Sequence, residues 1–338
     1  MTKTETKKQR HLNRWIVLLL LVAVMVVTSF FVPIRPVVKL PGEPISGILF
    51  TLPVIGEFRL TNTLLTTLLV DLFLIFLAFL VKRGLGDENK PSRGVAMLFE
   101  VMMEALYNMT VSTAGKKWAR QIFPLVATII VLVLVSNLIK LLPGMESIGL
   151  LESVTGEEGF KKVEVFSGLS YIVKETPTDG HGFEVVPFFR SPSTDLNFTL
   201  ALALIAVVMV QVFGIRANKL GYFSKFLNFG RFFKMWTKPN LNAFDAINPF
   251  IDIFAGILEG IAEFAKIISF SFRLLGSMFG GAILVAVIGS LLPFAQFGVY
   301  FLELFFGVIQ ALVFGVLTLV FSTVAIQSHG SHAEEHAH

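Results

Sequence analysis

Residues 249–292 read PFIDIFAGILEGIAEFAKIISFSFRLLGSMFGGAILVAVIGSLL, and the class of fold follows from this stretch. It is predominantly apolar, and a second apolar stretch, residues 295–327, comes directly after it. At about 1.5 Å per residue, helices of these lengths exceed the ~30 Å hydrocarbon core of a bilayer. We therefore expect two long membrane helices that tilt strongly or bend, with Pro293 at the turn between them.

The composition of the whole chain also supports a membrane protein. Of the 338 residues, 54% are hydrophobic and only 15% are charged, and the mean hydropathy is +0.75. Soluble domains carry about a quarter charged residues, so a soluble enzyme is excluded. The absence of cysteine excludes disulfides and thiolate metal sites. The net charge of +4 is too small to indicate nucleic-acid binding.

Other apolar stretches predict the remaining membrane helices. Residues 61–81, 121–142 and 196–215 are each long enough to cross a bilayer. Residues 94–113 are less hydrophobic and carry polar side chains at several positions. This pattern indicates an amphipathic helix on the membrane surface.

The two ends of the chain and one long loop have a different character. Residues 15–33 follow a basic segment, residues 1–14, and no small-x-small cleavage site follows them. We expect an N-terminal membrane anchor or an uncleaved signal-like helix there. Residues 143–194 are acidic, which predicts an exposed insert or a small β structure. Residues 328–338 hold four histidines; a metal could bind there, but the composition favours a solvated tail.

Basic residues predict the orientation in the membrane. They gather in residues 82–120 and 215–238 and near the N-terminus, whereas glutamates dominate the 143–194 insert. We therefore expect both termini and both basic loops in the cytoplasm and the insert on the outer side. Together these patterns predict an all-α polytopic membrane protein with five membrane helices and an extra N-terminal span.

Arg273 is the most costly residue for such a protein, because it lies about midway along the 249–292 stretch. An arginine at bilayer depth costs roughly 3 to 10 kcal/mol, and its pKa above about 12 keeps it charged. Snorkelling to the interface works near a helix end but poorly at the centre. A permanent cation at this depth indicates an acidic partner, either fixed or transient.

Helical spacing groups other polar residues with Arg273. Ser269 and Ser277 lie four residues before and after it, and Glu259 lies fourteen residues before it. These spacings place all of them on or near one helix face. The small residues at 276–281 predict that another helix packs very close to Arg273. Plain helix packing explains these glycines at least as well as a functional role does.

A second polar stripe lies on the following apolar stretch, where Glu303 and Gln310 are seven residues apart. A buried glutamate can exchange a proton near neutral pH, because desolvation raises its pKa. Gln310 does not titrate but can form hydrogen bonds beside a guanidinium, or can simply join two helices.

Polar residues elsewhere are weaker signals. Asp195 and Asn197 open the helix at 196–215, and Asp195 either caps that helix or contributes to an ion pathway. Lys140 lies near the outer end of its helix, where we expect it to snorkel to the surface. Asp71 lies within the helix at 61–81 and has no assigned role.

Taken together, these motifs resemble subunit a of the F-type ATP synthases. Arg273-Leu-Leu-Gly-Ser277-Met is similar to the arginine signature of that family, usually Arg-Leu-Phe-Gly-Asn-Met. The segment from Glu303 to Gln310, followed by Ala-Leu-Val-Phe-Gly, resembles the family's last helix. Three further segments agree: Asn137-Leu-Ile-Lys-Leu-Leu-Pro143, Asp195-Leu-Asn-Phe-Thr and Ile257-Leu-Glu259-Gly. The resemblance covers residues 58–327.

The resemblance implies a fold and an ion pathway. Residues 58–142 would form the first family helices. Residues 195–327 would form the ion-translocating core, with a tilted hairpin against a rotating ring of c subunits. Arg273 would face the essential carboxylate of the ring, between two offset aqueous half-channels.

The resemblance also implies roles for the other candidate residues. The outer half-channel would include Glu303, Asp195 and Asn197. The cytoplasmic half-channel would lie near Ser269 and Glu259. Gln310 and Ser277 match positions beside the arginine.

Proton translocation would be coupled to rotation of the ring and so to ATP synthesis, with no bond chemistry and no cofactor in this chain. The implied partners are the c-subunit ring, the peripheral-stalk b subunits, the soluble catalytic ATPase headpiece and membrane lipid, but no nucleic acid. The implied location is the bacterial cytoplasmic (inner) membrane.

Two positions depart from the family pattern. Ser277 stands where the family usually has asparagine, and Ala282 stands where it often has an acidic residue. We expect Glu303 to supply the missing carboxylate from the facing helix.

Two other functions are alternatives. A secondary transporter that binds an anion through Arg273 would have inverted repeats and broken helices, and the sequence has neither. A purely structural membrane scaffold leaves Arg273 unexplained.

Overall fold

The structure of the chain is a computed structural model. It describes residues 42–52, 56–85, 93–142, 145–146, 148–155, 160–166, 169–173, 181–219, 221–222, 243–292 and 295–327. The expected N-terminal anchor, the histidine-rich tail and most of the second basic loop lie outside the described residues.

Five helices in the described part of the chain are long and apolar enough to cross a membrane, which confirms the all-α class. They are α2 (Asn62–Gly84), α3 (Val95–Ile139), α4 (Leu196–Asn218), α6 (Ala243–Leu291) and α7 (Gln296–Gln327). The predicted long pair corresponds to α6 and α7. The Ala295 N–H donates to the Leu292 carbonyl oxygen at 2.9 Å, which ties the start of α7 to the end of α6.

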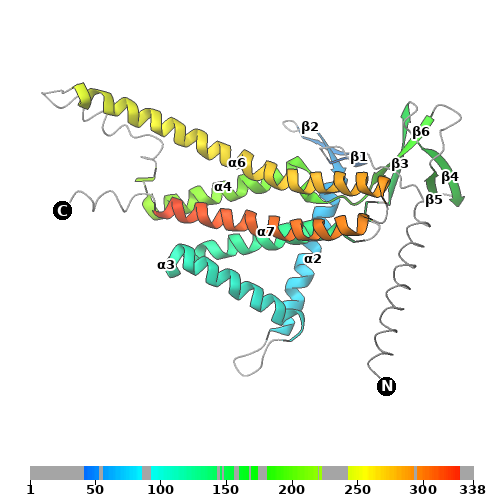
Figure 1. The fold of residues 1–338 in the computed structure, drawn as a ribbon, viewed down its shortest axis with the longest axis horizontal. Helices are drawn as coiled ribbons and strands as arrows, with labels where there is room; N and C mark the ends of the chain where they lie inside the picture. The colour runs from blue at the N-terminus through cyan, green and yellow to red at the C-terminus, as the bar shows by residue number, and fades with distance from the viewer. Residues whose placement is uncertain are drawn as a thin grey trace, which may run out of the picture. The chain divides into compact units, whose positions relative to one another are not determined.

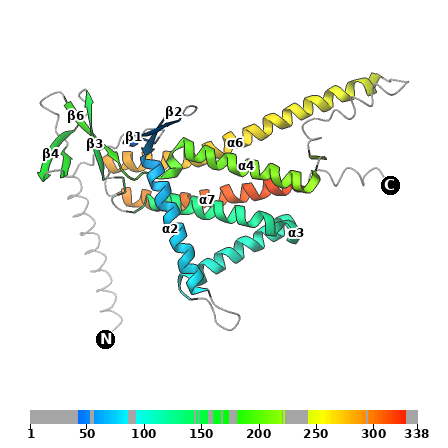
Figure 2. The same cartoon turned by 180° about the vertical axis from the view of Figure 1, so that it is seen from behind.

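The helix α3 is interrupted at Gly115, whose φ of +75° and ψ of 156° are not helical. Glycine adopts a positive φ without steric cost, because it has no Cβ. The two arms of α3 therefore fold back toward one another as a V (Figures 1 and 2). One arm contains the predicted amphipathic helix and the other the predicted span, while the surface location of the first arm stays a prediction.

The chain folds into two compact units. Unit 1 contains the described residues of 42–62, 140–190 and 278–306. Unit 2 contains those of 63–139, 191–277 and 307–327. The helices α6 and α7 each contribute residues to both units.

All strands described lie in unit 1, as three antiparallel pairs. In the acidic insert, β3 (Gly149–Thr155) pairs with β6 (His181–Pro187), and β4 (Lys161–Phe166) pairs with β5 (Leu169–Val173). This confirms the small β structure that the composition allowed. A further hairpin, β1 (Pro44–Leu52) with β2 (Gly56–Thr61), precedes α2 and was not anticipated.

The core of unit 2 is a helix bundle. Residues of α3, α4 and α7 form one buried apolar cluster: Leu106, Ile122, Val126, Ile130, Phe213 and Leu319. Phe270 of α6 contacts Phe314 and Phe321 of α7, with ring centroids 5.0 and 5.5 Å apart. The part of α6 around Phe270 consequently lies beside α7, whereas the N-terminal part of α6 runs away from α4 and α7 (Figures 1 and 2).

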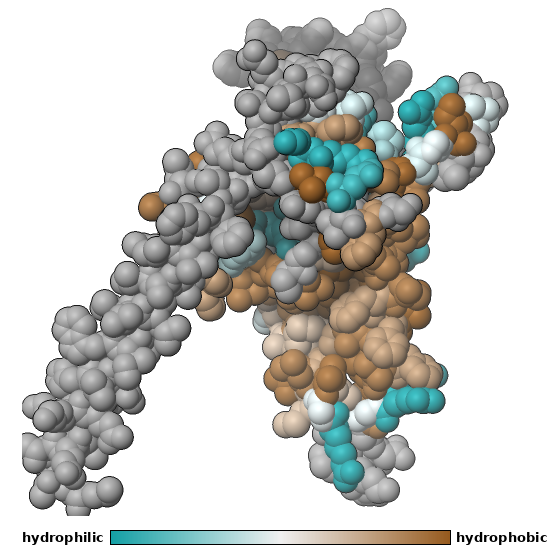
Figure 3. Space-filling model, turned by 90° about the vertical axis from the view of Figure 1, so that its right-hand side faces the viewer, coloured by the Kyte–Doolittle hydropathy of each residue, from teal (hydrophilic) through white to brown (hydrophobic). Residues whose placement is uncertain are grey.

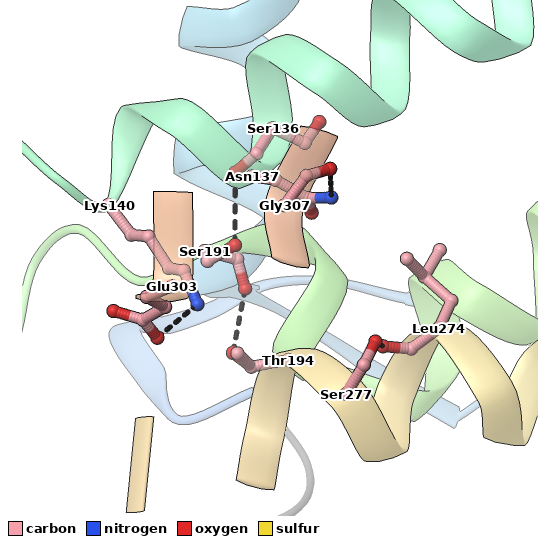
Figure 4. A network of polar contacts seen from close by, with 9 residues as sticks. All are labelled: Ser136, Asn137, Lys140, Ser191, Thr194, Leu274, Ser277, Glu303 and Gly307. Carbon is pink, nitrogen blue, oxygen red and sulfur yellow. Dashed lines mark hydrogen bonds and ion pairs between the residues drawn. The ribbon is translucent and has the colours of Figure 1, made fainter. Parts of the chain in front are cut away.

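Polar and small residues hold these helices together as well. The Oγ atoms of Thr199 in α4 and Ser271 in α6 are 3.1 Å apart, and both residues are buried. The Asn137 amide of α3 donates to the Gly307 carbonyl of α7 at 3.0 Å (Figure 4). A Cβ added at Gly307 would lie only 3.2 Å from the Asn137 Cβ, so the two helices approach each other closely at this glycine. Such contacts are typical of helices packed in lipid, where apolar burial alone gives little driving force.

Large apolar side chains also cover much of the surface. On α2, residues such as Leu72, Ile75 and Phe76 are exposed. The face drawn in Figure 3 shows a broad hydrophobic area, with polar residues beyond it. A soluble monomer rarely exposes so much apolar surface, so lipid is its natural solvent.

Candidate functional site

Arg273 is exposed on α6, within the apolar window Ile253–Gly289. The side chains next to it are suited to lipid, since Phe272 is 57% exposed and Ile268 is 41% exposed. Among the described residues, Arg273 has no hydrogen-bond or ion-pair partner. A guanidinium does not lose its proton, so Arg273 keeps its charge without a balancing carboxylate among the described residues.

The surface of α6 near Arg273 is small and polar. Ser269 is exposed, and Ser277 is half-buried with its Oγ donating to a backbone carbonyl of the preceding turn at 3.1 Å (Figure 4). A Cβ added at Gly276 or Gly280 would meet no atom within 4 Å. We predicted that another helix packs closely against these two glycines, but no helix of the described chain does so. The surface of α6 beside Arg273 is therefore open.

Gln310 of α7 belongs to the same unit as Arg273 and is 8% exposed. Its Nε2 has no hydrogen-bond partner in the part of the chain that the structure describes. No hydrogen bond between Gln310 and Arg273 is formed within that part, so their contact stays a prediction. Glu259 is half-buried on α6.

Glu303 forms an ion pair with Lys140 in unit 1. The Lys140 Nζ donates to Glu303 Oε1 at 2.5 Å, and the two side chains are 3% and 5% exposed (Figure 4). The prediction that Lys140 snorkels to the surface is therefore wrong. Its ammonium points instead to a carboxylate, because burying the pair together costs less than burying either charge alone.

The pair lies at a cavity of about 340 Å³ in unit 1, which Glu146 and Tyr300 also line. Ala282 lines the same cavity from α6. A Cβ added at the adjacent Gly281 would lie 2.9 Å from Glu303 Oε1, so the carboxylate lies directly over this glycine. The space left by two small residues of α6 thus holds the Glu303 carboxylate. That Glu303 replaces an acidic residue at position 282 in function stays a prediction.

Glu146 follows the end of α3 and is the third charged residue at this cavity. Burial raises the pKa of its carboxyl above the ordinary value of 4.5, since desolvation penalises the charged form. Lys140 lowers this pKa, Glu303 raises it further, and Arg190 lowers it. Burial is the largest of these effects, so the net shift of the Glu146 pKa is upward.

Asp195 caps α4, which was one of its two expected roles. Its Oδ1 accepts the Asn197 backbone N–H at 2.9 Å, and its Oδ2 accepts the Thr63 hydroxyl at 2.5 Å. Asp195 is buried, whereas the Asn197 side chain is exposed. A part in an ion pathway stays a prediction for both residues.

One buried polar network was missed by sequence reasoning. Glu263 of α6 is buried and accepts from Lys266 Nζ at 2.7 Å and from Gln211 Nε2 of α4 at 2.8 Å. The Tyr222 hydroxyl donates to Gln211 Oε1 at 2.6 Å. The three-residue spacing of Glu263 and Lys266 could have indicated their ion pair. The contact with Gln211 is not readable from spacing.

Long apolar helices with a buried carboxylate–ammonium pair, and with a guanidinium that has no partner among the described residues, define a polytopic membrane protein equipped to handle ions. Intramembrane charges of this kind mark ion and proton pathways. The family model described as "ATP synthase A chain" matches residues 63–323, and the chain therefore belongs to that family. This membership gives it a proton-translocating role in the membrane sector of an ATP synthase.

Curated relatives named "ATP synthase subunit a" agree over most of their length. The protein from Mycobacterium bovis is 28% identical over 80% of this chain and 89% of its own. The protein from Syntrophobacter fumaroxidans is 27% identical over 84% of this chain and 88% of its own. The protein from Helicobacter pylori strain Shi470 is 27% identical over 76% of this chain and 87% of its own.

Proposed function

We propose that this chain is the stator against which a ring of c subunits rotates, with Arg273 facing the essential carboxylate of the ring. The observation that supports this most is the exposed guanidinium on an apolar helix, with no counter-ion in the described residues. A passing ring carboxylate would supply the negative charge. The fixed positive charge would also block direct leakage of protons between two half-channels.

The proposed outer half-channel runs through the cavity that holds Glu303. A cavity lined by charged groups can admit water and protons, and Glu303 lies on α7 opposite Gly281 of α6. On α6, Gly281 follows Arg273 by eight residues, roughly two helical turns. Asp195 and Asn197 contribute less to this pathway, since the Asp195 oxygens already accept hydrogen bonds from the Asn197 N–H and the Thr63 hydroxyl.

The proposed cytoplasmic half-channel lies near Ser269 and Glu259. Ser269 is exposed, so its hydroxyl can hydrogen-bond to water, and the half-buried Glu259 has a carboxylate that can receive a proton from the ring. Ser277 and Gln310 are hydrogen-bonding groups that would hold the guanidinium in place.

These parts define a cycle of proton transfers. A proton from outside passes Glu303 and neutralises a ring carboxylate, which can then enter lipid without the cost of a buried charge. After nearly a full turn, this acid releases its proton into the cytoplasmic half-channel, and Arg273 attracts the bare carboxylate. Each charge that crosses 100 mV provides about 2.3 kcal/mol, so several protons must pass for each ATP.

In this proposal the chain carries out no bond chemistry itself. The soluble headpiece makes ATP, and the peripheral-stalk b subunits hold the chain against the headpiece. The basic loops and both termini face the bacterial cytoplasm, and the acidic insert faces outward.

The test is Arg273→Ala in the complete ATP synthase in inverted membrane vesicles. Proton-driven ATP synthesis should be abolished, because the ring carboxylate loses its cation. Arg59→Ala is a matched control, since Arg59 is exposed on β2 and pairs with Glu57. Co-purification with the ring and the headpiece verifies that both variants assemble. Synthesis at the wild-type rate by assembled Arg273→Ala refutes the proposal.

A further inference from the structure

The cavity at Glu303 contains more charge than one proton acceptor requires. The charged or titratable groups that face it, or act on its carboxyls, are Lys140, Glu146, Arg190, Tyr300 and Glu303. The helix α6 lines it with Ala282 and Val285, which do not titrate. Two carboxyls therefore share the cavity with one buried ammonium.

The geometry divides the roles of these two carboxyls. Glu303 accepts the Lys140 ammonium directly and is almost fully buried, so its charged form is balanced by this contact. Glu146 lies in the turn after α3, so it reaches the cavity from outside the membrane helices. It is less buried than Glu303. Glu146 is thus suited to take up a proton first, and Glu303 to receive it next.

The shared ammonium makes a transfer between the two carboxyls inexpensive. Before the transfer, Lys140 balances the Glu303 carboxylate while Glu146 holds the proton. After the transfer, Glu303 is neutral and Lys140 balances the Glu146 carboxylate. The total charge of the cavity is the same in both states, so no net charge is created in a medium of low dielectric constant.

We propose that Lys140 is the fixed cation of a two-carboxylate relay, in which a proton passes from Glu146 to Glu303 on its way to the ring. This proposal rests on the outer half-channel of the proposed function and specifies its first steps. In each step one O–H bond breaks and another forms, and the proton is the only species that moves. Lys140 remains an ammonium throughout and is a positioning residue.

The burial of Glu146 supports its place at the start of the relay. Its raised pKa brings proton uptake closer to neutral pH, where a proton carrier is most effective. Lys140 and Arg190 oppose this shift, which allows Glu146 to release the proton again.

The test uses the complete ATP synthase reconstituted in liposomes with the headpiece outside, so that the lumenal pH sets the proton supply to the outer half-channel. Lys140→Met removes the ammonium that contacts Glu303 and lowers the pKa of Glu146. The lumenal pH at which ATP synthesis falls to half its maximum should move upward by roughly one unit or more, and the maximum rate should fall. Lys140→Arg retains the cation and should retain the wild-type midpoint.

Glu146→Gln removes the first proton carrier. The rate of ATP synthesis should drop roughly tenfold, less than for the loss of a reacting acid or base, because water can still reach Glu303. Lys162→Met is the matched control, since Lys162 is a partly exposed lysine of the same unit that pairs with Glu164. It should leave the rate and the midpoint unchanged.

The outcomes separate the relay from the stator proposal. An assembled Lys140→Met variant with the wild-type midpoint overturns the relay, and so does Glu146→Gln with a wild-type rate and pH profile. If Lys140→Met fails to assemble, Glu146→Gln alone decides. Arg273→Ala tests the stator proposal independently. If Arg273→Ala is inactive while Lys140→Met and Glu146→Gln both behave like the wild type, only the relay is discarded.

Discussion

Lys140 and Glu303 form an ion pair across 163 positions of sequence, with 2.5 Å between Nζ and Oε1. Both side chains are almost completely buried. A buried ion pair is weak evidence for stability, because desolvation offsets the attraction, yet removing one partner leaves an unbalanced buried charge. The effects of this pair on stability and on transport can therefore be separated by substitution.

Lys140→Met should lower the stability of the subunit by about 3–5 kcal/mol, since it leaves the Glu303 carboxylate without a cation. Lys140→Met combined with Glu303→Met should recover most of this loss, because two apolar side chains replace both charges. Thermal unfolding of the purified complex measures the stability. The double variant should remain defective in transport. A single variant as stable as the wild type would show that the pair is not needed for stability.

Glu303→Gln should slow proton translocation and alter its pH dependence, because an amide accepts hydrogen bonds but does not titrate. ATP-driven proton pumping by the assembled complex at several pH values measures both effects. Glu152→Gln, an exposed change on β3, is the control. An unchanged pH profile in Glu303→Gln would remove Glu303 from the pathway.

Gly281→Ala should displace the Glu303 carboxylate, because the new Cβ would lie 2.9 Å from Oε1. We expect slower proton pumping, with a smaller defect than in Glu303→Gln. We also expect a lower unfolding temperature, with a smaller loss than in Lys140→Met. Gly47→Ala is the control, since a Cβ at that exposed position meets nothing within 4 Å. Pumping and stability equal to those of the control would mean that Glu303 does not depend on this glycine.

The membrane helices could be predicted from sequence because lipid imposes a simple rule. A long apolar run has to satisfy its backbone hydrogen bonds internally, and a helix does so. The pair α6 and α7 and the helices α2 and α4 follow from this rule within a few residues. The special position of Arg273 was also readable, since its charge is costly wherever the helix lies in lipid.

The partner of Glu303 could not be read from sequence, because it depends on which helix ends meet in space. Lys140 is an ordinary helix-end lysine by its neighbours along the chain, and snorkelling is the usual fate of such a residue. The same reason hid the contact between Glu263 and Gln211, which joins α6 to α4. The β1–β2 hairpin was not anticipated, although Glu57-Phe58-Arg59-Leu60-Thr61 of β2 alternates between polar and apolar residues as a half-buried strand does.

The raised pKa of Glu146 predicts that the stability of the folded protein depends on pH. Because its pKa is raised on folding, the unfolded chain binds fewer protons than the folded chain between 4.5 and the raised value. The stability of the wild type should therefore fall as the pH rises through this window, and the penalty is absent below 4.5. The stability of Glu146→Gln relative to the wild type should therefore increase as the pH rises through this window. Below pH 4.5 the difference between the two proteins should not change with pH. Thermal unfolding of the complex at a series of pH values provides the measurement, and a constant difference at all pH values would contradict it.

Cysteine cross-linking tests most directly whether the surface around Arg273 faces the ring. The chain contains no cysteine, so an introduced thiol has no background in this subunit. Phe272→Cys and Gly276→Cys lie beside Arg273 on exposed positions, whereas Val133→Cys, at a fully buried position of α3, is the control. Each is combined in the assembled complex with a cysteine one helical turn from the ring carboxylate. We predict a disulfide with the ring for the first two variants and none for the control. Assembled complexes in which neither exposed position cross-links to the ring would contradict the claim that Arg273 is presented to its carboxylate.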